Sequence, residues 1–314
     1  MRIAALAVGG LLFAAGCDNN NSTSSGNTPI TPGNTTLTVT VNSGPTGNYV
    51  NGAFATVTVC VPGTTSCQSI DGMLVDTGSS GVRILSSVLT LSLPTVPASN
   101  GSPLLECNQF VDGFTWGPVQ TADVKMAGEQ ASRVPIQVIG TSSFSTIPGS
   151  CSASGGSPED TLDTLGAKGV LGIGVFRQDC GNGCTFSGSS NPGVYYTCSG
   201  ANCQVATVPL VQQVQNPVWL FAGDNNGTVV QLPTASTSGQ ATLSGLLAFG
   251  IGTQSNNALG SAQVLTLDQT GSFTTVFRGQ SYNRSFIDTG SNGTFFLDSS
   301  ATGLPTCTHS TDFY

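Results

Sequence analysis

The stretch "GMLVDTGSSGVRIL" (residues 72–85) decides the expected fold of this chain. A short apolar run leads into Asp76, which is followed by Thr, Gly and two Ser, and the arrangement recurs around Asp288 in "SFIDTGSNGTFFL" (residues 285–297). One D-T-G sequence is weak evidence, because the junction of a strand and a turn favours Asp and Gly for their local hydrogen bonds and permissive backbone. Two such sequences, each after an apolar run, predict a pair of related loops that carry carboxylates.

The composition favours an all-β protein. Gly numbers 41 and charged residues make up only 8% of the chain, while Thr, Ser and Val are abundant and good helix formers are few. The 314 residues are enough for two domains of about 150 residues each. Lys+Arg 8 against Asp+Glu 16 gives a net charge of −8, which argues against a nucleic acid as partner.

The N-terminus has the layout of an export signal: a positive start, an apolar run and small residues directly before Cys17. The apolar run is too short for a comfortable membrane span. "AAGC" resembles the lipobox of bacterial lipoproteins, in which the signal is removed and the new N-terminal Cys carries lipid. The resemblance implies a signal peptide over residues 1–16 and an exported protein, anchored to the bacterial membrane through lipid on Cys17 and facing the periplasm or the exterior. A plain signal peptide with an incidental Cys is the alternative. Residues 17–36 then form a polar tether that cannot build a core.

Export would place the other cysteines in an oxidising compartment, where they are disulfide candidates. Three spacings would close small loops and one a longer link: Cys60/Cys67, Cys180/Cys184, Cys198/Cys203 and Cys107/Cys151. Cys307 is then left without a partner. The spacings are not C-x-x-C pairs and the only His is His309. We therefore expect no metal site, no cofactor, and no Ser–His or Cys–His catalytic unit.

Apolar and polar residues alternate over much of the chain, as in half-buried strands. Strands are expected at residues 36–41, 53–61, 134–140, 217–223, 227–233 and 262–267. One short helix is expected at residues 207–216, where Thr207 can cap the first turn and Pro209 lies inside it.

The fragments follow one another in a familiar order. "GAFATVTVCVPG", "IDGMLVDTGSSG", "FVDGFTWGPVQTADVKMAGE", "GAKGVLGIG", "PVWLFAGDNNGTVVQLP" and "FIDTGSNG" together resemble the pepsin-like, two-lobed aspartic peptidases, from about residue 46 to 297. The resemblance implies an all-β, pepsin-like acid-protease fold with two β-barrel-like lobes and a cleft between them. Residues 37–206 would form the N-terminal lobe and residues 207–314 the C-terminal lobe.

In that family two carboxyl groups share one proton and hold a water molecule. The ionised carboxylate takes a proton from the water, while the protonated carboxyl hydrogen-bonds the scissile carbonyl. The resemblance implies that Asp76 and Asp288 are this catalytic pair, and that a peptide or protein substrate occupies the interlobe cleft. The supporting loop residues would be Thr77, Gly78, Ser79, Thr289, Gly290 and Ser291. The flap over the substrate would include Phe110, Asp112 and Gly113.

Some positions depart from the family pattern. Phe110 stands where the flap usually has Tyr, and Arg83 stands where its Trp partner usually lies. Trp116 is a candidate substitute for that pair. Arg83, if near the cleft, would favour ionised carboxylates and lower their pKa values. Few residues follow Asp288, so we expect the second lobe to be incomplete in this chain and the reading frame to continue through further strands and at least one Cys.

The sequence therefore predicts an aspartic endopeptidase of the bacterial cell envelope. The alternative is a non-catalytic envelope lipoprotein of the same fold that acts in binding or assembly, because a fold does not fix a function. The lipobox, the tether, "DTGSSGVR" and a disulfide-rich insertion from about residue 177 to 205 also resemble an uncharacterised bacterial lipoprotein family, a domain of unknown function with aspartic-peptidase-like motifs.

Overall fold

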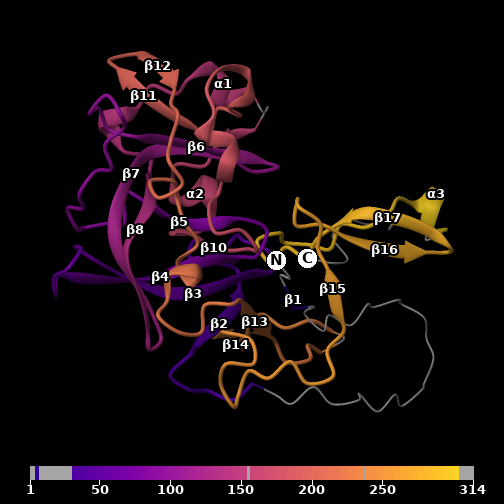
Figure 1. Ribbon diagram of the computed structural model, residues 1–314. Coiled ribbons are helices and arrows are strands. Elements are labelled where there is room, and N and C mark those ends of the chain that lie inside the picture. The colour runs from indigo at the N-terminus through magenta and orange to yellow at the C-terminus, as the bar shows by residue number, and fades with distance from the viewer. Residues whose placement is uncertain (1–3, 7–29, 154–155, 237, 304–314) are drawn as a thin grey trace, which may run out of the picture.

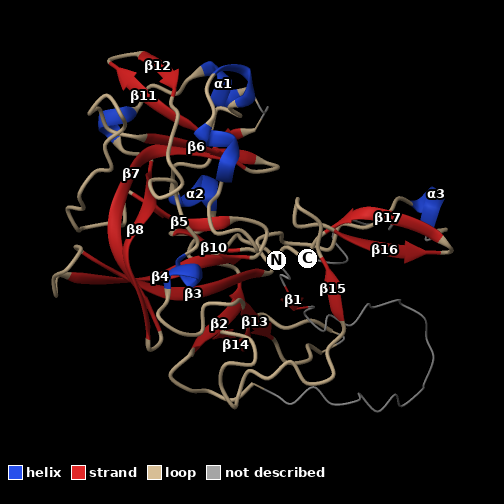
Figure 2. Cartoon of the chain, viewed as in Figure 1, coloured by secondary structure: helices blue, strands red, loops and turns tan. Residues whose placement is uncertain are grey.

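The computed structural model describes residues 4–6, 30–153, 156–236 and 238–303. The predicted lipidation site Cys17, the unpaired Cys307 and His309 lie outside these residues. Most of the regular structure is strand (Figure 2), so the all-β prediction is confirmed.

The strands are β1 (Ala4–Leu6), β2 (Thr36–Asn42), β3 (Gly52–Cys60), β4 (Cys67–Asp76), β5 (Ser80–Leu85), β6 (Leu105–Gln109), β7 (Gly113–Met126), β8 (Glu129–Ile139), β9 (Ser157–Pro158), β10 (Gly169–Ile173), β11 (Tyr195–Ser199), β12 (Asn202–Val205), β13 (Thr228–Gln231), β14 (Leu243–Phe249), β15 (Val264–Thr266), β16 (Phe273–Phe277) and β17 (Gln280–Ser285). The helical segments are short: α1 (Gly149–Ser152), α2 (Leu162–Leu165) and α3 (Ser299–Thr302), with 3₁₀ turns η1 (Ser142–Phe144), η2 (Gly181–Thr185), η3 (Gly188–Ser190) and η4 (Pro217–Leu220). Among the described helices, none is both long and apolar enough to cross a membrane.

A closed ring of strands forms the first half of the molecule (Figure 1). β3, β4, β10, β5, β8 and β7 pair in that order, and the end of β7 returns to pair with β3. Strand β10 runs parallel to β4, and β5 runs parallel to β8. The side chains that point inward are branched and apolar, among them Val57, Val75 and Ile136, all fully buried. Because the ring closes on itself, it leaves no free sheet edge around its core.

The same sheet extends beyond the ring in both directions. Strands β6, β11 and β12 continue it from β7, and strands β2, β14 and β13 continue it from β3. Because β14 pairs with β2 over residues 243–248 and 36–41, the second half of the chain is joined to the first by a shared sheet.

The rest of the second half is more open. β16 and β17 form a separate hairpin that projects away from the ring in Figure 1, and β15 pairs with β1. Within residues 207–236 and 238–303, the strands form no closed ring of their own.

The predicted helix at residues 207–216 is wrong. Its backbone N–H groups bond to distant segments, with Val208 donating to the Cys184 carbonyl (2.8 Å) and Val214 to the Tyr195 hydroxyl (2.7 Å). Val208 and Val214 are buried in one cluster, although six positions on a helix would turn them to different faces. A turn at residues 210–212, in which the Gln212 N–H donates to the Pro209 carbonyl (2.9 Å), takes the place of the helix, and the residues on either side follow an irregular path.

The predicted strand at residues 217–223 is also wrong. The Asn216 side chain accepts a hydrogen bond from the Val218 N–H (3.0 Å) and caps the 3₁₀ turn η4. Val218 and Phe221 are both buried, and their three-residue spacing fits a 3₁₀ turn rather than a strand.

All four predicted disulfides are present. Two of them join paired strands, one ties β6 to α1, and one closes η2: Cys60–Cys67, Cys198–Cys203, Cys107–Cys151 and Cys180–Cys184. These bonds are typical of an oxidising compartment.

Candidate active site

The two D-T-G loops meet although they are far apart in the sequence. Asp76 ends strand β4, and Asp288 follows strand β17. The N–H of Thr77 donates to Thr289 Oγ1 (3.1 Å), and the N–H of Thr289 donates to Thr77 Oγ1 (3.0 Å). Each Thr hydroxyl also donates a hydrogen bond to the other loop. The acceptor is the backbone carbonyl of the residue before the Asp, at 3.0 Å from the Thr77 hydroxyl and 2.7 Å from the Thr289 hydroxyl. The predicted supporting role of both Thr therefore has a reciprocal, symmetric geometry, which we call the threonine lock.

The glycines of the motif let each loop approach the carboxyl group of the other. A Cβ added to Gly78 would lie 2.7 Å from Cγ of Asp288, and a Cβ added to Gly290 would lie 2.8 Å from Cγ of Asp76. Any larger residue at either position would push the loops apart. The structure thus brings the two predicted carboxyl groups to one place.

Each carboxylate is also held by its own loop. The N–H of Gly78 donates to Asp76 Oδ1 (2.7 Å), and the hydroxyl of Ser79 donates to Oδ2. In the second loop, the amide two residues after Asp288 donates to its Oδ1 (2.8 Å), and the Ser291 hydroxyl donates to its Oδ2 (2.6 Å). These bonds fix the orientation of both carboxyl groups.

The environment of Asp76 favours its protonated form. Its side chain is buried, and burial together with the nearby Asp288 carboxyl raises its pKa to about 6, while the hydrogen bonds from Ser79 and Gly78 oppose this rise. Asp288 is less buried. The two carboxyl groups therefore lie in unequal environments. Such a pair can hold a single proton in weakly acidic solution.

Arg83 does not lie in the cleft. It is fully buried, and its Nη2 is 2.5 Å from Glu106 Oε1 and 3.3 Å from Asp179 Oδ2. Its Nη1 donates to the Ser80 carbonyl (2.9 Å), behind the first loop. The expected effect of Arg83 on the carboxyl pair is therefore wrong for Asp76, because Arg83 pairs with Glu106 and Asp179 instead and the pKa of Asp76 is raised rather than lowered.

The predicted flap is a hairpin of β6 and β7, closed by a hydrogen bond from the Phe110 N–H to the Gly113 carbonyl (2.8 Å). Asp112 is exposed at its tip. Phe110 packs against an apolar cluster that includes Phe54. Trp116 donates its indole N–H to the Phe144 carbonyl (2.7 Å), so it does not replace the missing flap hydroxyl.

A family model matches residues 30–314 of the chain, which is most of its length. The chain belongs to the family DUF3443. That family is described as a protein of unknown function. No curated protein matches the chain. Among solved structures, the chain is similar to the crystal structure of an aspartic proteinase from Irpex lacteus, with 15% sequence identity and a TM-score of 0.42. The match covers 74% of this chain and 52% of that one, so the chain spans about half the length of that structure.

Sequence reasoning missed two residues at the site. Tyr49, between β2 and β3, donates its hydroxyl to the Gly290 carbonyl (3.0 Å). Glu159 lies against the flap, where its N–H donates to the Phe114 carbonyl (2.9 Å). The sequence signal for Tyr49 is a large aromatic residue within the turn-rich segment "GPTGNYVNG". Glu159 gives no comparable signal.

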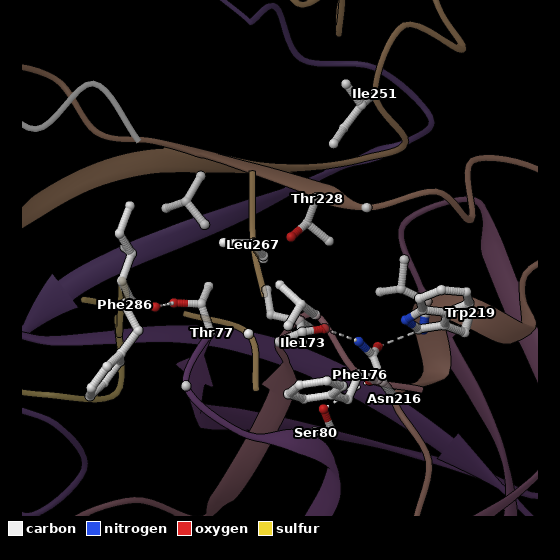
Figure 3. A pocket seen from close by; sticks show the side chains of 18 of the residues that line it. Thr77, Ser80, Ile173, Phe176, Asn216, Trp219, Thr228, Ile251, Leu267 and Phe286 are labelled. Atoms are coloured by element: carbon white, nitrogen blue, oxygen red, sulfur yellow. Dashed lines mark hydrogen bonds between the residues drawn. The ribbon is translucent and has the colours of Figure 1, made fainter. Parts of the chain in front are cut away.

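Behind the first loop lies a cavity of about 440 Å³. Figure 3 shows its lining, with Thr77 and Phe286 toward one end and Trp219 at the other. Most of the lining is apolar, and neither catalytic candidate is part of it. The cavity therefore reaches both D-T-G loops, through Thr77 and Ile287, without being lined by the two carboxyl groups themselves. The part of the chain that the structure describes contains no group of three or more His, Cys, Asp or Glu arranged to hold a metal ion.

Proposed function

We propose that this protein is an aspartic endopeptidase that hydrolyses peptide bonds with a water molecule held between Asp76 and Asp288. The observation that carries the proposal is the threonine lock, which brings two loops 212 residues apart into register and sets their carboxyl groups together. A lock of this kind has little use in a protein that needs only one of the two carboxylates.

The chemistry follows from the unequal environments of the two groups. One carboxyl of the pair keeps its proton and donates a hydrogen bond to the scissile carbonyl oxygen. The other is ionised and takes a proton from the water, whose oxygen bonds to the carbonyl carbon. The resulting tetrahedral intermediate expels the amine after the nitrogen receives that proton. The raised pKa of Asp76 supports the presence of one proton on the pair in weakly acidic solution.

The proposed substrate is a peptide or protein segment in extended form. The β6–β7 hairpin offers main-chain groups to such a strand, and pockets for alternate side chains would give specificity. The four disulfides support action outside the reducing cytosol. We propose that lipid on Cys17 and the following tether hold the enzyme at the bacterial membrane.

The test is cleavage of a randomised peptide library by the soluble chain, from the tether onward, between acidic and neutral pH. We expect cleavage that falls by about 100-fold or more in Asp76→Asn and in Asp288→Asn, because each change removes an acid–base group. Circular dichroism and intact disulfides must show that all three proteins are folded.

If none of the three folded proteins cleaves the peptide library, the peptidase proposal is rejected. The alternative, a non-catalytic envelope lipoprotein that acts in binding or assembly, then takes its place.

A further inference from the structure

A short segment before β3 donates hydrogen bonds to backbone carbonyl groups of the second candidate catalytic loop. The Tyr49 hydroxyl donates to the Gly290 carbonyl (3.0 Å), and the Asn51 side-chain amide donates to the Asn292 carbonyl (3.4 Å). Each of these bonds spans 241 residues. The threonine lock joins the loops at their Thr residues, and this second contact holds the segment that follows.

Glycines hold the Tyr49 ring in place. A Cβ added to Gly166 would lie 2.4 Å from Cδ2 of the ring, and a Cβ added to Gly52 would lie 2.6 Å from Cδ1. The ring also packs edge-on against Phe54, with centroids 5.6 Å apart and an interplanar angle of 79°. A ring confined by backbone on both sides has little freedom to move, so its hydroxyl has a well-defined position.

The residue whose carbonyl Tyr49 holds is in contact with both carboxyl groups. The Gly290 N–H donates to Asp288 Oδ1 (2.8 Å). The Cα of Gly290 packs so closely against Asp76 that an added Cβ would lie 2.8 Å from the Asp76 Cγ. A shift of Gly290 would therefore change the spacing of the pair.

The hydroxyl of Tyr49 keeps its proton, and so remains a hydrogen-bond donor, over the whole pH range in which Asp76 titrates. Burial, followed by the nearby carboxyls of Asp112, Asp76, Glu159 and Asp288, raises the pKa of Tyr49 to about 12. These carboxyls come from the flap tip, from β4, from the segment after β9 and from the second loop. The bond from Tyr49 to the loop is therefore present from acidic to alkaline pH.

We propose that Tyr49 is a positioning residue, whose hydroxyl sets the place of the second catalytic loop relative to Asp76. The proposal deepens the proposed peptidase function and rests on it for its kinetic consequences. The flap lacks a tyrosine because Phe110 stands there, and Tyr49 brings a phenol to the same site from a different element.

Tyr49→Phe removes only the hydroxyl and keeps the ring between the glycines. We expect amide hydrogen exchange in residues 288–292 to become about 5-fold faster, as for the loss of one ordinary hydrogen bond. Tyr282→Phe, which makes the same chemical change on β17, should leave exchange in residues 288–292 unchanged. Asn51→Gly, which removes the second contact and suits the left-handed backbone at that position (φ 56°), should give a smaller acceleration in the same residues.

In the active enzyme, Tyr49→Phe should lower kcat by about 5-fold with little change in KM, because the loop moves relative to Asp76 rather than to the substrate. The alkaline limb of the kcat profile should shift to lower pH, since a looser loop lets water reach Asp76 and lowers its raised pKa, so that the pair loses its proton sooner. A purely structural role for Tyr49 would leave that limb in place.

Unchanged exchange in residues 288–292 overturns the proposal, whether or not the protein cleaves peptides. Faster exchange in a protein that cleaves nothing supports the contact and rejects only the peptidase function. Faster exchange with unchanged kcat and an unchanged pH profile in an active enzyme also overturns the positioning role.

Discussion

At Asp76, burial and the neighbouring Asp288 carboxyl both raise the pKa of the side chain. The carboxyl group is nearly inaccessible and faces a second carboxyl, so its pKa rises from 3.8 to about 6. A folded protein that binds this proton more tightly than the unfolded chain is most stable at low pH. The contribution is fully present below pH 3.8, decreases as the pH rises toward about 6, and is then lost.

Asp76→Asn should therefore stabilise the folded protein near neutral pH, because the amide carries no charge to bury and still accepts the Gly78 hydrogen bond. The shift in pKa corresponds to about 3 kcal/mol at most. Urea unfolding at pH 4 and pH 7 measures the effect, with a gain expected only at pH 7. An equal gain at both pH values would mean that the pKa of Asp76 is not raised.

The hydroxyl of Thr289 makes two bonds of the threonine lock, one as acceptor and one as donor. Thr289→Val keeps the shape but leaves the Thr77 N–H unpaired, at a cost of about 1–3 kcal/mol, and peptide cleavage should fall with it. Thr289→Ser retains the hydroxyl and serves as the matched control. Thermal unfolding compares the three proteins, and equal stability of the Val and Ser variants would argue against the lock.

At the scale of elements, a buried ionic cluster connects β5 and β6 to the segment after β10. Arg83 and Glu106 are both fully buried, and Glu106 Oε2 is among the buried polar atoms without a hydrogen-bond partner. Burial raises the pKa of Glu106 well above its ordinary value, against the opposing effect of Arg83. The cluster thus depends on Arg83 as its positive charge.

Arg83→Met should destabilise the protein by about 3–5 kcal/mol, because it leaves buried carboxylates uncompensated. Arg83→Met combined with Glu106→Gln should recover part of that loss, since Gln cannot ionise and needs no buried positive partner. Chemical denaturation of the single and double variants measures the coupling. A double variant that is no more stable than Arg83→Met alone would contradict the pairing.

The flap has a titrating contact of its own. Burial, and then Asp112, raise the pKa of Glu159 from 4.5 to about 7, and the Glu159 side chain lies over Gly113, where it would meet an added Cβ. The protonated form therefore favours the closed hairpin tip, and this preference decreases between pH 4.5 and about 7.

Hydrogen exchange at the flap tip should accelerate as the pH rises through about 7, after correction for the intrinsic pH dependence of exchange. Glu159→Gln should remove this transition, because the amide stays neutral. Asp163→Asn, a change of an exposed carboxylate on α2, is the control. A transition that persists in Glu159→Gln would assign it to another group.

These elements also show where sequence reasoning works. The pairs Cys60/Cys67 and Cys198/Cys203 and the two D-T-G loops are local patterns, and the structure brings each set together. The Arg83 cluster and the Tyr49 contact depend on partners far away in the chain, which no local periodicity records. Residues 207–216 resemble a helix only if their tertiary hydrogen bonds are ignored.

At the scale of the whole molecule, the two halves share one sheet through β2 and β14. Strand β14 lies between β2 and β13, so both of its edges are in use. Leu246 is paired with Thr38 on one side and Gln231 on the other.

Leu246→Pro should loosen the second half while leaving the ring of β3, β4, β10, β5, β8 and β7 intact, because proline disrupts a central strand. Limited proteolysis should then cut residues 238–303 several times faster than in the parent and spare the ring. Leu246→Val, which keeps the strand, is the control. Equal protection in all three proteins would show that the shared sheet does not hold the halves together.

The closed ring has a consequence for how the protein is made. Its strands all come from residues 52–173, so a nascent chain can complete this unit early, and domains generally fold in that order during synthesis. Asp288 reaches the ribosome exit much later, and its loop must then find a partner that has already folded. A nascent chain that has not yet reached Asp288 would carry one carboxylate and no pair, so the proposed peptidase activity could begin only after that residue is made.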